Sequence, residues 1–145
     1  MFAAESGEVR SPWGERIYVS REKAGRRRVT NEAALAARLA ARGFVTVRAE
    51  EWSWAEQCAG FRGAKEIVAP HGAGLANLVW CAPGTRVVEV FPRAYVNGCF
   101  WRLAAVVGLD YRPVVAVGEG AVRCELAANK EDFAVDADAV ERALA

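Results

Sequence analysis

The chain has 145 residues, a formal net charge of +1, and 53% hydrophobic against 26% charged residues. This length suits one folded domain, and the apolar composition excludes an intrinsically disordered chain. The small net charge provides no field that would recruit nucleic acid or an anionic membrane, so we expect neither as a partner.

Strand and helix patterns alternate along the chain after an irregular lead-in at residues 1–15. Runs rich in β-branched residues predict strands, and alanine- or aromatic-rich runs bounded by capping residues and glycines predict helices. In chain order we expect a strand at 16–20, a basic loop at 21–29, a helix at 30–43, a strand at 44–48, a helix at 53–64, a strand at 66–70, a helix at 72–81, a strand at 86–92, a helix at 98–108, a strand at 111–117 and a helix at 135–145. Thr30 and Ser53 are the expected N-caps of the first two helices.

This alternation predicts the α/β class. The strands at 66–70 and 86–92 are apolar on both faces, which is typical of a parallel sheet covered by helices on both sides. Right-handed crossovers then produce a Rossmann-like, doubly wound, mostly parallel sheet. We expect residues 16–145 to form this single domain.

The four cysteines, Cys58, Cys81, Cys99 and Cys124, form no C-x-x-C pair, and the chain has one histidine. A zinc site is therefore not expected, and the cysteines are interpreted as reduced and buried in a cytoplasmic protein. The N-terminus lacks the basic and apolar regions of a signal peptide, and no apolar run reaches the roughly 20 residues of a membrane span.

His71, the only histidine, follows the strand at 66–70 and precedes Gly72 and Gly74. In an open α/β sheet, ligands bind at the carboxyl ends of the strands, where the next helix begins. Glycines there admit a ligand close to the backbone, and free N–H groups at a helix start favour phosphate. The alternative is a tight strand-to-helix turn with a structural histidine.

A second group of residues favours an anion. Arg21, Lys23, Arg26, Arg27 and Arg28 lie in the loop after the first strand, which should end at the same sheet edge as His71. Guanidinium groups bind diphosphate oxygens in pairs, so the two loops together predict a diphosphate pocket. A solvated basic loop is the alternative.

These residues also resemble a known family. The segments SREKAGRRRVTNE, EEWSWAEQCAGFRGAKEIVAPHGAGLANLVWCAPGTRVVEVFP and WRLAAVVGLDY are similar to those of the family 61 glycosyltransferases, from about Arg16 to the C-terminus. The H-G-A-G-L-x-N block at 71–77 is the most specific part. The resemblance implies the C-terminal, donor-binding lobe of a GT-B-type enzyme that moves a sugar from a nucleotide-diphosphate donor to a glycan or protein hydroxyl, without a cofactor.

The resemblance also implies roles for individual residues. It makes His71 and Glu32 catalytic, and it makes the following residues contacts of the nucleotide sugar: Arg21, Arg28, Asn31, Gly72, Ala73, Gly74, Asn77 and Glu89. Simpler readings exist, since Asn77 can bond neighbouring backbone and Glu32 can complement a helix dipole. Because Glu89 lies in an apolar strand, its carboxylate needs a partner.

Two further features shape the expectation. The sequence DAD at 136–138 matches a metal-binding D-x-D pattern, but it opens the last predicted helix, where Asp138 and Glu141 have capping spacing, so we expect no metal. Trp13 and Tyr95 lie in predicted loops and are candidates for stacking on a base or sugar. The core is expected to take up the other aromatic residues considered, which are Trp52, Trp54, Trp80, Phe100 and Trp101.

Three functions remain in competition. The first is the glycosyltransferase donor lobe, whose expected partners are an acceptor and either a separate N-terminal lobe or a second copy of the chain. The second is a non-catalytic nucleotide-binding or interaction lobe that docks with a separate N-terminal half. A nicotinamide oxidoreductase is disfavoured because residues 16–25 lack the glycine fingerprint after the first strand.

Overall fold

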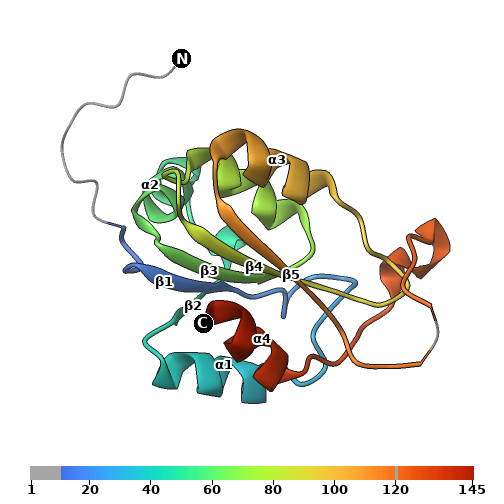
Figure 1. The fold of residues 1–145 in the computed structure, drawn as a ribbon. Coiled ribbons are helices and arrows are strands. Elements are labelled where there is room, and N and C mark those ends of the chain that lie inside the picture. Colours follow the sequence, from blue (N-terminus) through green and yellow to red (C-terminus); the bar gives the residue numbers. More distant parts are fainter. Residues whose placement is uncertain (1–10, 120) are drawn as a thin grey trace.

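The computed structural model describes residues 11–119 and 121–145. Five strands form one sheet in the order β2-β1-β3-β4-β5, and every neighbouring pair is parallel. Their bounds are β1 (Arg16–Val19), β2 (Val45–Val47), β3 (Glu66–Pro70), β4 (Arg86–Phe91) and β5 (Asp110–Val115). The expected α/β fold with a Rossmann-like parallel sheet is confirmed (Figure 1).

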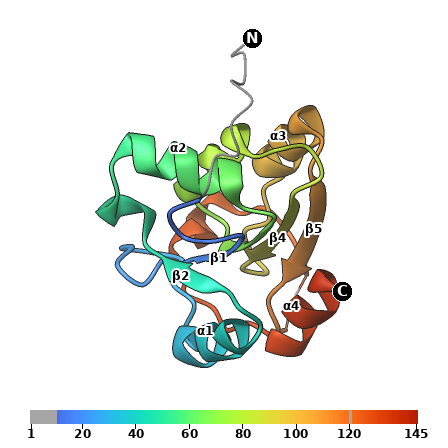
Figure 2. The same cartoon turned by 90° about the vertical axis from the view of Figure 1, so that its left-hand side faces the viewer.

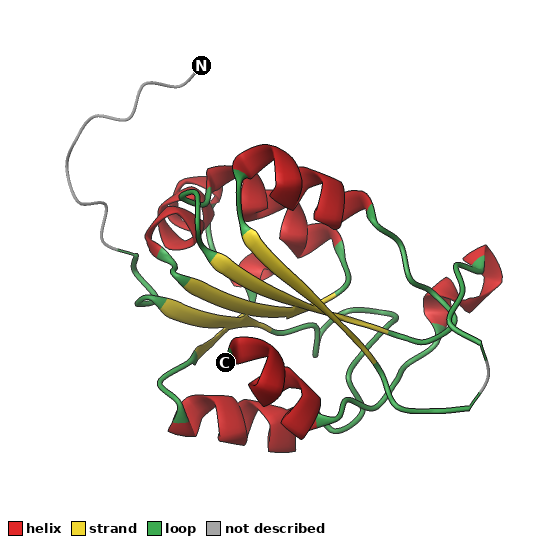
Figure 3. Ribbon diagram, in the orientation of Figure 1, coloured by secondary structure: helices red, strands yellow, loops and turns green. Residues whose placement is uncertain are grey.

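Helices cover both faces of the sheet. One face carries α1 (Glu32–Ala41) and α4 (Ala137–Leu144), and the other carries α2 (Trp54–Gly63), the 3-10 helix η2 (Ala73–Trp80) and α3 (Cys99–Val107) (Figures 2 and 3). Two short 3-10 helices, η1 (Ala49–Glu51) and η3 (Leu126–Lys130), lie in the connections.

The alternation of side chains along each strand builds two cores. Tyr18, Val68 and Val88 point toward α1 and α4. Ile17, Ile67 and Val87 point toward α2, η2 and α3. These six side chains are fully buried, which accounts for the apolar character of the central strands on both faces.

The helix starts differ in part from expectation. Ser53 caps α2 in a capping box with Glu56, as its sequence spacing predicts. The prediction that Thr30 caps α1 is wrong, because α1 begins at Glu32 and its N-cap is Asn31, whose side chain is bonded elsewhere. The helix expected at 72–81 is a 3-10 helix, and the Asn77 amide donates to the Gly74 carbonyl within it, an alternative to regular helical pairing.

The aromatic expectations are partly wrong. Trp13 is 4% exposed and packs against Trp52 and Phe61, so it is part of the core. Trp54 and Trp101 are 69% and 56% exposed, because they lie on outward faces of α2 and α3, and Trp52, also expected in the core, is 37% exposed. Helical spacing alone does not say which stripe of a helix faces the sheet.

Residues 1–10 of the lead-in lie outside the described residues. Of the four free cysteines only Cys81 is buried, and Cys99 and Cys124 are exposed, so the expectation that all are buried is wrong. Among the described helices none has the length and apolar character needed to cross a membrane.

Candidate functional site

The candidate site lies between β1 and β3, where the order in which the chain adds strands to the sheet reverses. From β1 the chain passes through α1 to β2 on one side, and from β3 it passes through η2 to β4 on the other. A crevice opens at the carboxyl ends of strands that diverge in this way. A pocket of about 290 Å³ lies there, and its lining includes Ser20, Arg21, Lys23, Pro70, Gly72 and Gly74. We call it the switch-point pocket.

Arg21 lies directly against Gly72. A Cβ atom added to Gly72 would come within 1.9 Å of Arg21 Nη1. The Nε atom of Arg21 is buried without a hydrogen-bond partner, while Nη2 donates to the Arg26 carbonyl at 3.1 Å. Within the described residues no carboxylate lies within 4.0 Å of this guanidinium.

The guanidinium of Arg21 therefore has no direct ion-pair partner, although Glu50 also lines the pocket and Lys23 is paired with Glu51. Burial lowers the pKa of Arg21, the neighbouring charges of Arg27 and Arg26 lower it further, and the charge of Glu50 opposes them in part. Since the charged guanidinium is disfavoured in this environment, an anion entering the pocket would relieve both the desolvation and the repulsion. The geometry thus fits an anionic group.

The backbone adds neutral donors at the same place. Gly72 has φ 171° and ψ 172°, an extended conformation, so the glycine is needed for space rather than for its dihedral angles. The N–H groups of Ala73 and Gly74 occupy the first positions of η2, where no partner exists inside the helix. Donors of this kind are the usual backbone contribution to a phosphate site.

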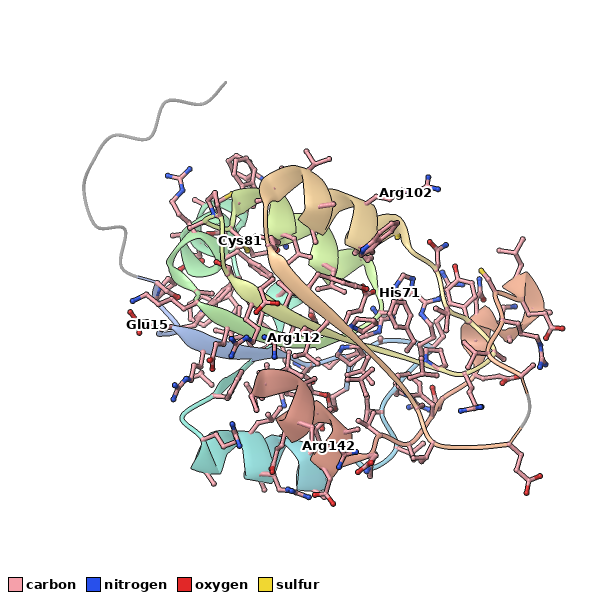
Figure 4. All side chains as sticks on the ribbon, viewed as in Figure 1. Glu15, His71, Cys81, Arg102, Arg112 and Arg142 are labelled. Atoms are coloured by element: carbon pink, nitrogen blue, oxygen red, sulfur yellow. The ribbon has the colours of Figure 1, made fainter. Side chains whose placement is uncertain are left out.

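His71 belongs to a buried polar triad beneath α3. Its Nδ1 lies 2.5 Å from Glu89 Oε1, and the Tyr111 hydroxyl donates to Glu89 Oε2. Glu89 is fully buried and His71 is 4% exposed. Because Nδ1 is engaged with Glu89, Nε2 is the ring nitrogen left to meet a ligand. Figure 4 shows His71 at the opposite end of the sheet from Glu15, which precedes β1.

Aromatic rings hold the imidazole in place. The ring centroids of Phe91, Phe100 and Tyr95 lie 5.1, 5.4 and 5.5 Å from that of His71. The main-chain N–H of His71 donates to the Val90 carbonyl at 2.8 Å, which continues the β3–β4 pairing. The side chain thus has little freedom to turn away from Glu89. Tyr95 is itself buried and does not offer an open stacking face.

Arg28 and Glu32 lie in a separate cavity on the other side of β1. This cavity, of about 670 Å³, opens between α1 and the ends of β1 and β2. Arg28 is paired there with Asp132, whose pKa it lowers, at an Nη2–Oδ2 distance of 2.8 Å. Glu32 Oε1 accepts from the Tyr18 hydroxyl at 2.8 Å and from the Arg21 main chain at 3.3 Å. Glu32 therefore links the two cavities, while Arg28 is turned from the switch-point pocket.

Both candidate asparagines make internal contacts. The Asn31 side chain donates to the Val135 carbonyl at 2.8 Å and accepts from the Val135 N–H at 2.9 Å. The Asn77 amide donates to Gln57 and to the Gly74 carbonyl. These contacts favour a structural role for both, in which Asn31 fastens the C-terminal segment and Asn77 fastens η2.

The DAD segment has a local structural explanation. Asp136 is the N-cap of α4 and accepts from the Asp138 N–H. Asp138 and Glu141 both pair with Arg38 of α1, so the expected capping between these two acidic residues is wrong. The part of the chain that the structure describes contains no cluster of three or more histidine, cysteine or acidic residues able to hold a metal ion.

Sequence reasoning missed Tyr111. A signal for it existed, because Glu89 in an apolar strand needs a partner and the adjacent strand is the place to look. Tyr111 pairs in register with Val87, two residues before Glu89 on the same face. Burial is the main reason that the pKa of Tyr111 is raised, and the bond to Glu89 adds to it. The hydroxyl therefore remains a donor to the carboxylate.

Comparison with known proteins gives one result. A family model described as glycosyltransferase 61 matches residues 3–88. The match covers the basic loop at 21–29, which we call the arginine loop, together with β3 and the H-G-A-G-L-x-N block. It ends one residue before Glu89. The expected resemblance is confirmed over this part of the chain. A search of curated proteins returned no match.

Proposed function

Because this chain belongs to the glycosyltransferase 61 family, we propose that it binds a nucleotide-diphosphate sugar in the switch-point pocket and serves as the donor-binding lobe of the transferase. The observation that carries the proposal is the partly buried Arg21 guanidinium, which has no carboxylate partner and lies against Gly72. A diphosphate supplies the anion that this arrangement lacks.

The proposed reaction is a substitution at the anomeric carbon of the donor. The oxygen of a glycan or protein hydroxyl forms a bond to this carbon, and its proton passes to water. The bond from the carbon to the diphosphate breaks, and the electron pair leaves with the diphosphate. Arg21 and the N–H groups of Ala73 and Gly74 offset the charge that develops on the leaving group. Donors fixed in place before the reaction act most effectively at such a position, so no metal ion is required.

His71 is buried and does not line the switch-point pocket, but it directly precedes the lining residue Gly72, so in this proposal it acts at the edge of the donor site. Nδ1 is engaged with Glu89, so Nε2 is the ring nitrogen proposed to meet a phosphate oxygen of the donor. Tyr111 and Glu89 act through His71 by fixing the ring, and they do not touch the donor. Glu32, which bonds the Arg21 main chain, is proposed to hold the first residue of the loop in place and to face the acceptor side.

Calorimetric titration with UDP tests this proposal. We expect UDP to bind the wild-type chain and Arg21→Ala to weaken the affinity by about 10- to 100-fold, the loss for a charge-assisted hydrogen bond. Arg38→Ala is the matched control, because Arg38 pairs with Asp138 and Glu141 between α1 and α4. Absence of UDP binding, or equal losses in the two variants, would contradict the proposal.

A further inference from the structure

Arg27 contacts three residues outside the arginine loop. It is 8% exposed, and its guanidinium donates from Nε to the His71 carbonyl at 3.3 Å and from Nη1 to the Asn129 carbonyl at 2.9 Å. The same group lies over the Tyr95 ring, 5.2 Å from its centroid. One side chain thus joins three segments that are distant in sequence.

The backbone of Arg27 shows that this position is held by its surroundings. Its φ is 53°, in the left-handed region that residues other than glycine and asparagine rarely adopt. Such a conformation persists where several contacts determine it together. The two carbonyl contacts and the ring contact provide them.

The contact with Asn129 brings the C-terminal segment into the site. Residues 126–135, which we call the clasp, also bond the arginine loop through Asp132 and Phe133, and bond Asn31 at the start of α1 through Val135. The clasp follows β5 and lies outside the matched residues 3–88. Of its contacts with the arginine loop, only the one to Arg27 is made by a side chain that also reaches His71.

We propose that Arg27 is a positioning residue for His71, and that the Asn129 carbonyl of the clasp holds Arg27 from its other side. The inference deepens the proposed function, on which its role in donor binding rests. Arg27 fixes the main chain at His71, directly before Gly72, and it holds Tyr95 against the imidazole. Neither Arg27 nor His71 lines the switch-point pocket, so Arg27 acts on the donor through the His71 main chain, which leads directly into the lining residue Gly72.

The chain offers an unambiguous probe, because His71 is its only histidine. Long-range proton–nitrogen NMR correlations of the imidazole therefore report on this residue alone, with or without nucleotide. Two variants separate the effects. Arg27→Asn keeps a residue that tolerates the left-handed backbone but lacks the guanidinium, and Arg27→Lys keeps the charge without the planar fork. Asp132→Ala is the control, since it loosens the clasp at Arg28 and leaves Arg27 intact.

We expect Arg27→Asn to shift or split the His71 ring signals and to weaken UDP binding about tenfold, with Asp132→Ala matching the wild type in both measurements. Unchanged His71 signals in a folded Arg27→Asn chain would overturn the inference, as would equal shifts in Asp132→Ala. Should Arg27→Asn fail to fold, Arg27→Lys decides in the same way, because one ammonium group cannot bridge both carbonyls. The ring signals need no ligand, so a chain that binds no UDP refutes the proposed function and still tests this one.

Discussion

The guanidinium of Arg21 occupies the space that a side chain at Gly72 would need: an added Cβ would come within 1.9 Å of Nη1 and 2.7 Å of Cζ. Because the backbone at Gly72 is extended, any residue could adopt its conformation. The glycine is therefore explained by the close approach of the arginine. This relationship joins the two loops that the sequence places at one sheet edge, and it makes them one site.

Gly72→Ala should consequently displace Arg21 and weaken UDP binding. We expect a loss of about tenfold, comparable to removal of one hydrogen bond to a charged group. Gly25→Ala is the matched control, since a Cβ at Gly25 meets nothing within 4 Å. Calorimetry on both variants measures the effect, and equal affinities for UDP would argue against a role for the Arg21–Gly72 contact.

Tyr111→Phe should destabilise the fold. The substitution removes the donor to Glu89 Oε2 and leaves one oxygen of a fully buried carboxylate without its bond. A hydrogen bond to a charged group contributes about 1.5–3 kcal/mol, so the free energy of unfolding should fall by this amount. Tyr95→Phe removes a hydroxyl that makes no hydrogen bond to the described residues and serves as control. Urea unfolding of the two variants gives the comparison.

Asp110 should make stability depend on acid pH. Arg112, and then Arg86, lower the pKa of Asp110 below its ordinary value of 3.8. The ionised carboxylate is favoured in the folded state, so its contribution is complete above about pH 3.8 and disappears as the pH falls through the lower folded-state pKa. Asp110→Asn should reduce the melting temperature at pH 7, and the difference from wild type should vanish in strong acid. A constant difference at all pH values would contradict this assignment.

Gly60→Ala tests the packing of the core between the sheet and α2, η2 and α3, to which Trp13 belongs. An added Cβ would come within 2.2 Å of the Trp13 ring, which is buried and cannot yield easily. Alanine improves helix propensity by about 1 kcal/mol, whereas overpacking costs about 1–3 kcal/mol. We expect overpacking to dominate and the melting temperature to fall. Gly98→Ala, whose Cβ would meet Trp101 at an ordinary 3.8 Å, should leave it nearly unchanged.

Local sequence patterns were sufficient to predict the sheet and the proximity of the loop after β1 to the turn after β3. Each strand carries its own signal in β-branched residues, and parallel strands necessarily place Arg21 and His71 at one edge. Gly108, expected to end the helix at 98–108, does so with φ 83°. Such features depend on neighbours along the chain, which the sequence shows directly.

Features that depend on distant partners were not predictable in the same way. The separation of Arg28 from the switch-point pocket follows from its pairing with Asp132, which lies 104 positions later in the chain. The Asn31 contacts with Val135 have the same sequence separation. The residues next to Arg28 in the sequence do not indicate which anion it binds. A diphosphate ligand and a carboxylate of the same chain were therefore equally compatible with the loop sequence.

The central claim is that the switch-point pocket binds the diphosphate of a nucleotide. Titration of the labelled chain with UDP, followed through backbone amide chemical shifts, tests it most directly. We predict the largest saturable shifts at the amides of Gly72, Ala73 and Gly74, with smaller ones at residues that line only the cavity beside α1. Saturable shifts confined to that second cavity, or no shifts at all, would contradict the account.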